Sequence, residues 1–191
     1  MPDVNLDNLD DMLKECNPKT YDQLMSFKRM YKSIKWKAIS FTIPMIPKPS
    51  KRPRLSGRRI YVPGAAKNGS FFQRTVLPTL QDTFIETPCS VKLDIYVPTP
   101  KSFSKLQACL AEMRILRPWT RTGDVDNFEK AVYDMIQPNE KRGHRGILSD
   151  DSLIIEACTN KYYSKTPRYE LTISYMGKIP ESIQKVLKLD H

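Results

Sequence analysis

The residues that follow Gly123 have the periodicity of an amphipathic helix. Apolar side chains recur there at i, i+3, i+4, i+7 and i+8, and they are Phe128, Ala131, Val132, Met135 and Ile136. This spacing places all five on one stripe of a helix surface. We therefore predict a helix with one apolar side and one polar side, and the polar side carries Asp126, Lys130 and Asp134.

Periodicity elsewhere predicts a mixture of helices and strands. Alternating apolar residues predict strands over 36–45, 90–97, 152–163 and 169–176, with a shorter strand within 57–63. The last two long strands are expected to form a hairpin. Helices are predicted over 4–15, 19–34, 67–84 and 103–116, with a kink or restart at Pro78 and a short helix or tail over 183–189.

The 191 residues are enough for one domain with a proper core. We expect an α/β (mixed α+β) fold, a single compact domain in which flanking helices accompany a mixed sheet of four to five strands. The expected organisation is an N-terminal helical extension over 1–35, a main domain over 36–178 and a C-terminal tail over 179–191.

The charge of the chain favours a polyanionic partner. It contains 31 Lys and Arg against 21 Asp and Glu, a net charge of +10, which points first to nucleic acid and then to an anionic membrane. Residues 23–81 contain thirteen Lys or Arg and no acid. We predict that this segment supplies the main phosphate contacts, through Lys48, Lys51, Arg52, Arg54, Arg58, Arg59, Lys67 and Arg74. The alternative is a loop that is basic only for solubility.

Targeting signals and cysteine pairs are missing from the sequence. It has no apolar run of about 18 residues for a bilayer span and no secretion signal at its acidic N-terminus. The four cysteines are scattered and include no CxxC pair. We expect reduced, mostly buried thiols, a cytoplasmic protein, no membrane partner and no structural zinc.

Two acidic clusters predict a metal site. Asp124 and Asp126 begin the helix, and Asp150 and Asp151 precede an apolar strand. Adjacent carboxylates raise each other's pKa unless a cation is near, and carboxylate oxygens are ligands that Mg²⁺ prefers. A strand can bring Asp151 beside the helix start, where one or two metal ions would activate a water near a phosphate.

Lys130 would then neutralise negative charge on that phosphate. The alternative account is structural. It makes Asp124 an N-cap, Asp126 a partner of the helix dipole, and Asp126–Lys130 a surface ion pair at i, i+4.

The pattern of these residues resembles that of the RusA-like Holliday junction resolvases, common in phages and prophages of bacteria. The resemblance covers roughly residues 36–176. It lies in Asp124-x-Asp126-Asn127-x-x-Lys130-Ala131-x-x-Asp134, in Asp150-Asp151 followed by an apolar strand with Glu156, in the closing strand Tyr169–Ile173, and in Ile43-Pro44 with Pro47 and Ser50. The N-terminal extension and the long connection over 137–147 depart from the family pattern.

The resemblance implies a homodimer that cuts four-way DNA junctions by symmetric nicking with Mg²⁺ or Mn²⁺. It gives metal-ligand roles to Asp124, Asp126 and Asp151 and an essential basic role to Lys130, and Asp150 either shares the metal or supports its ligands. We therefore expect a metal-dependent, structure-selective endodeoxyribonuclease that binds branched DNA without a small-molecule cofactor. The alternatives are a nuclease preferring forks or flaps and a non-catalytic branched-DNA-binding protein.

Three further residues have open interpretations. Trp119 either stacks on an unpaired base or packs in the core. His144 is expected to face DNA or solvent rather than to act as a general base. Glu129 is expected to be solvated on the polar edge of the helix.

Overall fold

The computed structural model describes residues 18–51, 54–56, 59–61, 64–80, 83–119, 122–181, 183 and 185. The chain divides into two compact units, one made of residues 1–36 with 176–191 and the other of residues 37–175. The helix predicted over 4–15 lies outside the described residues. Within the described part, no helix is long and apolar enough to cross a bilayer.

The smaller unit is built around helix α2 (Pro18–Ser33), which confirms the helix predicted over 19–34. Its small core joins the two ends of the chain, because Ile34 is buried together with Met176, Ile179 and Ile183. The N–H of Gly177 also donates a hydrogen bond of 2.9 Å to the carbonyl of Lys35. Residues 181, 183 and 185 are helical.

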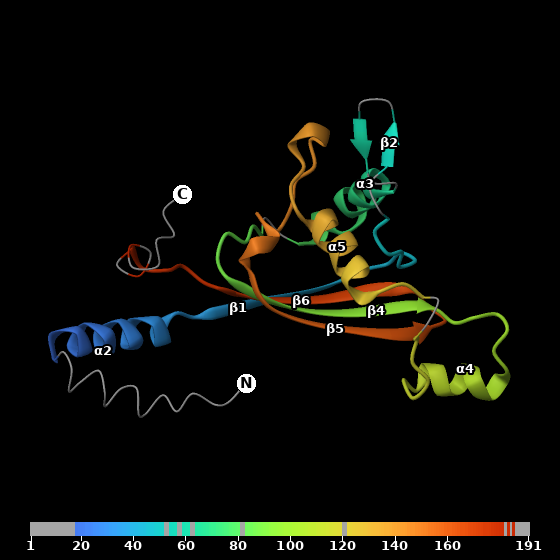
Figure 1. The fold of residues 1–191 in the computed structure, drawn as a ribbon, viewed down its shortest axis with the longest axis horizontal. Helices are drawn as coiled ribbons and strands as arrows, with labels where there is room; N and C mark the ends of the chain where they lie inside the picture. The colour runs from blue at the N-terminus through green and yellow to red at the C-terminus, as the bar shows by residue number, and fades with distance from the viewer. Residues whose placement is uncertain are drawn as a thin grey trace. The chain divides into compact units, whose positions relative to one another are not determined.

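A four-stranded sheet forms the centre of the larger unit (Figure 1). Its strands are β1 (Trp36–Ile43), β4 (Cys89–Pro98), β5 (Ile154–Ser164) and β6 (Arg168–Met176), in the order β1-β6-β4-β5. β4 pairs in parallel with β5 and antiparallel with β6. The mixed α/β class and the four-stranded mixed sheet are as the sequence predicts.

The predicted hairpin of the last two strands is wrong. β4 lies between β5 and β6 and pairs with both. Two inter-strand spacings make a gap of roughly 10 Å, and residues 165–167 are long enough to cross it. Sequence proximity made the two strands look like partners, but β4, whose inward side chains are almost all buried, takes the central place.

Helices α5 (Val125–Ile136) and α3 (Ala65–Thr75) lie over one face of this sheet (Figure 1). The predicted stripe on α5 is buried, with Phe128 and Val132 at 1% and 0% exposure. The helix predicted over 67–84 stops before Pro78, and a 3₁₀ turn over Leu77–Thr79 follows it, because proline cannot continue the hydrogen-bond ladder.

The remaining elements are short. The short strand predicted within 57–63 is confirmed as β3 (Arg59–Tyr61), which pairs antiparallel with β2 (Arg54–Ser56), a strand that the sequence analysis did not predict. Helix α4 (Lys105–Glu112) begins at a capping box formed by Ser104 and Gln107. 3₁₀ turns occupy Glu140–Arg142 and Asp151–Leu153.

The cysteines only partly follow the prediction. Cys89 is a free, buried thiol, and burial raises its pKa to about 11. Cys109 and Cys158 are free but exposed, so the expectation of mostly buried thiols is wrong for the described cysteines.

Candidate active site on helix α5

The loop between β1 and β2, which carries Lys48 and Lys51 and is called the basic loop below, is anchored to the rest of the larger unit at two points. The N–H of Lys48 donates a hydrogen bond of 3.0 Å to the hydroxyl of Tyr169, which is buried in the core. The N–H of Ser50 donates one of 2.7 Å to the carbonyl of Asn127, in the first turn of α5. These bonds fix the loop alongside the helix.

Gly123 lets the same loop touch the start of the helix. Its backbone φ is +91°, and a Cβ at this position would lie 2.9 Å from Cγ of Pro49, so any other residue would be both strained and too close. Its carbonyl accepts a hydrogen bond of 2.7 Å from Nζ of Lys161 on β5. The first turn of α5 is therefore held between the basic loop and the edge strand of the sheet.

The carboxylates of Asp124 and Asp126, at the start of α5, do not take the expected structural roles of capping group and ion-pair partner. Asp124 occupies the N-cap position, but its side chain makes no capping hydrogen bond. Asp126 is exposed in the first turn, and no ion pair joins it to Lys130 in the part of the chain that the structure describes. The structural interpretation of these residues is therefore only partly confirmed. Asp124 is at the N-cap position and Asp126 is in the first turn, but the expected capping hydrogen bond is not formed.

Asp150 and Asp151 differ in their surroundings. The carboxylate of Asp150 accepts a hydrogen bond of 2.8 Å from the N–H of Ser152, which caps the 3₁₀ turn η3 (Asp151–Leu153). Hydrogen bonding to Ser152 lowers the pKa of Asp150. Asp151 is exposed, and its carboxylate makes no such bond.

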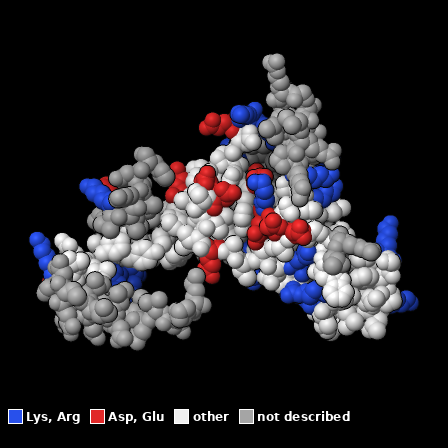
Figure 2. Space-filling model, viewed as in Figure 1, with Lys and Arg blue, Asp and Glu red and all other residues white. Residues whose placement is uncertain are grey.

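The segment before this turn is tied to the second half of α5. The N–H of Ile147 donates a hydrogen bond of 2.8 Å to the carbonyl of Ile136, and the N–H of Ser149 donates one of 3.0 Å to the carbonyl of Ile85. In Figure 2 acidic side chains lie over the start of α5 and, apart from these, over the turn before β5.

Asp134 interacts electrostatically with Lys130 on α5 and with Asp151 on the turn before β5. Burial raises its pKa, the positive charge of Lys130 lowers it, and the negative charge of Asp151 raises it further. Burial likewise raises the pKa of Tyr133 to about 12, with smaller contributions that include Asp151. The cluster of Lys130, Asp134 and Asp151 therefore lies along the second half of α5, and Asp134 is about 12 Å along the axis from Asp126.

The four predicted metal ligands, Asp124, Asp126, Asp150 and Asp151, are thus spread along the helix and the neighbouring turn. Among the described residues, no three acidic, histidine or cysteine side chains are close enough together to hold one metal ion. The donor type suits Mg²⁺, because the exposed groups are carboxylates.

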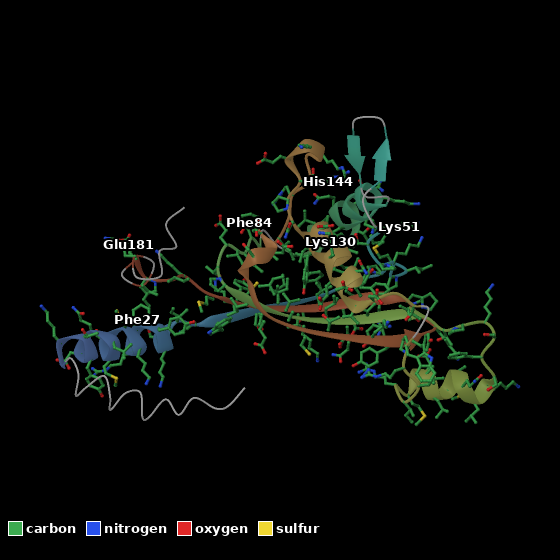
Figure 3. All side chains as sticks on the ribbon, in the orientation of Figure 1. Phe27, Lys51, Phe84, Lys130, His144 and Glu181 are labelled. Carbon is green, nitrogen blue, oxygen red and sulfur yellow. The ribbon has the colours of Figure 1, made fainter. Side chains whose placement is uncertain are left out.

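A pocket of about 200 Å³ opens between the basic loop and α5. It is lined by Lys48, Pro49, Ser50, Lys51, Gly64, Lys67, Asn68, Ala131, Asp134 and Met135. Three of the predicted DNA-contact lysines thus surround one cavity together with one carboxylate. Figure 3 shows Lys51 on the loop and Lys130 on the neighbouring helix.

The side chain of one other predicted phosphate contact, Arg74, is described, and it does not line this pocket. Arg74 is exposed on α3 and donates a hydrogen bond of 3.2 Å to the carbonyl of Ser70. Arg54 lies on β2 and Arg59 on β3. Arg52 and Arg58 lie outside the described residues.

Asp134 is a residue of this site that the predicted set of ligands and catalytic groups did not include. Its signal was its position four residues after Lys130, which places both on the same side of a helix. The side chain of Asp134 is exposed, and its partial desolvation and the approach of Asp151 depend on a distant segment and leave no trace in the local sequence.

Two further predictions are corrected. Glu129 is half-buried and accepts a hydrogen bond from Oγ1 of Thr159 on β5, so it ties the helix to the sheet instead of being solvated. His144 is half-buried, with Nε2 3.4 Å from Oγ of Ser70. A Cβ at Gly69 would lie 2.9 Å from Nδ1 of His144, so this histidine packs against α3 and is half-buried rather than fully exposed to solvent.

Comparison with known proteins identifies the family of the chain. Residues 44–174 match the family model described as Endodeoxyribonuclease RusA, which is more than half of the chain and includes both the basic loop and all of α5. A protein of Bacillus subtilis (strain 168), "Uncharacterized protein YqaN", is 35% identical over 142 residues, which are 71% of this chain and 94% of that protein. The resemblance inferred from the acidic motif is confirmed, and the chain belongs to the RusA endodeoxyribonuclease family.

Proposed function

We propose that this protein is a metal-dependent, structure-selective endodeoxyribonuclease that resolves four-way DNA junctions by paired nicks. The observation that carries the proposal is the pocket on which Lys48, Lys51 and Lys67 converge beside the acidic polar side of α5. The lysines that suit phosphate line the pocket together with Asp134, the same helix carries exposed carboxylates that suit a metal ion, and the chain belongs to an endodeoxyribonuclease family.

The residues have distinct roles in this proposal. The three pocket lysines hold phosphates of the DNA backbone, and Lys130 stabilises negative charge that develops on the scissile phosphate. Asp124 and Asp126 would hold Mg²⁺ or Mn²⁺ together with phosphate oxygens and water, because Mg²⁺ is commonly bound through one or two carboxylates, and the ion would supply Lewis acidity and a water of lowered pKa. Asp151, the third predicted ligand, lies on the neighbouring turn, and no three such side chains of the described residues are close enough together to hold one ion. Asp150 supports the site by capping the turn that presents Asp151.

Paired nicking requires two copies of this site. A four-way junction offers two equivalent strands, so a C₂ homodimer presents two sites in matching geometry. Light scattering of the protein at micromolar concentration tests this part of the proposal, which a fully active monomer would contradict.

The function itself is tested with a labelled mobile four-way junction, incubated with and without Mg²⁺ or Mn²⁺. We expect symmetric nicks only with metal, and none in a linear duplex of the same sequence. Asp126→Asn is the matched variant, because it removes one charge and keeps the size of the side chain. Metal-independent binding without cutting by the wild-type protein would favour a branched-DNA-binding protein, and preferred cutting of forks or flaps would change the substrate class.

A further inference from the structure

The face of the sheet opposite α5 carries an ordered group of arginines and tyrosines. Tyr96 on β4 lies beside Tyr162 on β5, and their rings are stacked with centroids 5.3 Å apart. Cζ of Arg168 lies 3.8 Å from the centre of the Tyr96 ring, and Cζ of Arg117 lies 4.2 Å from that of Tyr162. Arg114 lies over both rings, 4.9 Å from Tyr162 and 5.6 Å from Tyr96.

Two of these arginines keep their charge uncompensated. Arg168 pairs with Glu170 at 2.7 Å. Arg114 instead donates a hydrogen bond of 2.9 Å to the hydroxyl of Tyr96, and neither it nor Arg117 forms an ion pair within the described ranges. A guanidinium stacked on a ring is held in place while the N–H donors at its edge stay available for phosphate.

The backbone at Arg114 supports the same arrangement. Its φ is 60°, and among the described non-glycine residues no other has a positive φ. This conformation is uncommon for a long side chain. It follows the C-cap of α4, where helices commonly end in this conformation, and the Arg114 guanidinium lies over the tyrosine pair.

Trp119 follows Arg117 by two residues and is 82% exposed. This excludes the interpretation that it packs in the core. An indole this exposed has both faces available for stacking, and base–aromatic stacking does not depend on the identity of the base.

The segment that carries Arg114, Arg117 and Trp119 connects this face of the sheet to the candidate active site. Tyr162 and its neighbour Lys161 point to opposite faces of the sheet, and Lys161 holds the carbonyl of Gly123 at the start of α5. Trp119 is four residues from Gly123, so their Cα atoms are at most about 14 Å apart. A strand that reaches Asp124 can therefore pass round the edge of β5 to Trp119 within a few nucleotides.

We infer that Trp119, Arg114 and Arg117 form a second DNA contact, on which an unpaired base at the branch point stacks while the arginines hold the adjoining phosphates. The inference rests on the proposed junction-cutting function and assigns the recognition of the branch to this surface. Bases within a duplex have both faces covered by their neighbours, so only DNA opened at a branch offers a free face to the indole.

The charge of the surface favours DNA over a protein partner. Leu106, Met113 and Ile115 are also exposed nearby, at 69%, 66% and 63%, and would suit an apolar partner or a second copy of the chain. Two uncompensated guanidinium groups beside the indole would, however, oppose burial in an apolar interface. A protein interface is therefore the competing outcome of the test.

Tryptophan fluorescence measures the contact without any cutting. The chain contains only two tryptophans, so Trp36→Phe leaves Trp119 as the single reporter. The protein is titrated in EDTA with a four-way junction and with a duplex of equal length. We expect quenching by the junction and little quenching by the duplex at concentrations where both are bound.

Binding by variants then separates stacking from general affinity. Trp119→Ala should weaken junction binding about 10-fold and leave duplex binding unchanged, while Trp119→Phe should recover most of the affinity. Leu106→Ala is the control, because it removes an exposed apolar side chain from the same surface without touching the proposed contact. Circular dichroism checks that each variant is folded.

The outcomes separate this inference from the proposed function. Equal losses of affinity for junction and duplex would overturn it, as would fluorescence that changes with protein concentration alone, which indicates an interface between copies. If Trp119→Ala cuts junctions normally with Mg²⁺ and no quenching occurs, the inference alone fails. A wild-type protein that neither binds nor cuts junctions would contradict both the inference and the proposed function.

Discussion

Two pairs of aspartates precede two turns of this protein, and the fold uses them differently. Asp150 caps its turn through the N–H of Ser152, whereas Asp124 occupies the N-cap of α5 without making a capping bond. Both positions look alike in sequence, because aspartate is a favoured N-cap residue. The comparison shows that the carboxylates at the start of α5 are not needed as caps, which leaves them available for chemistry.

The largest expected effect is the loss of cutting when Asp126, whose carboxylate is not needed as a cap, is neutralised. Asp126→Asn should lower the junction-cleavage rate by roughly 10³-fold, because it removes a metal ligand, and should keep or tighten DNA binding by removing a charge that repels phosphate. Single-turnover cleavage and binding in EDTA measure the two effects.

Asp150→Asn is the matched control from the other pair. It should lower thermal stability slightly, because the cap is weakened, and should reduce cutting far less than Asp126→Asn. Equal losses of cleavage in the two variants would contradict the division of roles between the two pairs.

Lys130→Ala should lower the cleavage rate by about 10²-fold with normal folding, because the compact ammonium no longer stabilises the developing charge. Lys130→Arg keeps the charge with a different geometry and should recover only part of the rate. Arg74→Ala, on α3 outside the pocket, serves as the control. Cleavage by Lys130→Ala at the wild-type rate would return Lys130 to a surface role.

The pocket lysines should determine the salt dependence of binding. Replacing Lys48, Lys51 and Lys67 by glutamine should flatten the slope of log affinity against log salt by about 0.9 for each phosphate that is no longer neutralised. Junction binding measured across a series of salt concentrations gives this slope. An unchanged slope would move the phosphate contacts away from the pocket.

The smallest effect concerns protonation, and here Asp134 and Asp150 have opposite signs. The pKa of Asp134 is raised by burial, so its contribution to stability is lost as pH rises from the unfolded pKa to the folded pKa. The pKa of Asp150 is lowered by the Ser152 hydrogen bonds, so its contribution is lost as pH falls through the folded pKa.

NMR titration of Asp134 checks the cluster directly. Lys130→Ala should raise its pKa further, because a nearby positive charge is removed, and Asp151→Asn should lower it, because a negative charge is removed. An Asp134 pKa that Asp151→Asn leaves unchanged would place the turn away from α5.

The sequence predicted those parts of the site that depend on neighbouring residues. The stripe from Phe128 to Ile136 predicted the helix, and the fold buries these side chains. The same helical geometry placed Lys130 on the polar side, where it acts on Asp134. The acidic motif predicted the family, which the comparison over residues 44–174 confirms.

Contacts between residues far apart in the sequence decided the remaining features of the fold and the site. β4 pairs with both β5 and β6, so these strands form no hairpin. Glu129 gains a partner in Thr159 on another element, and Asp151 lies near Asp134 because Ile147 and Ser149 bind the backbone at Ile136 and Ile85.

The sequence by itself thus determined the presence of helices α2 to α5, most of the described strands, the basic segment and the family of this protein. The tertiary structure alone decided that Asp134 shares a pocket with three lysines, that Asp150 rather than Asp124 caps a turn, and that Trp119 stays in solvent. The physical reason is one of range. Periodicity and capping preferences act over about four residues, whereas burial and electrostatic contacts depend on segments far apart in the chain.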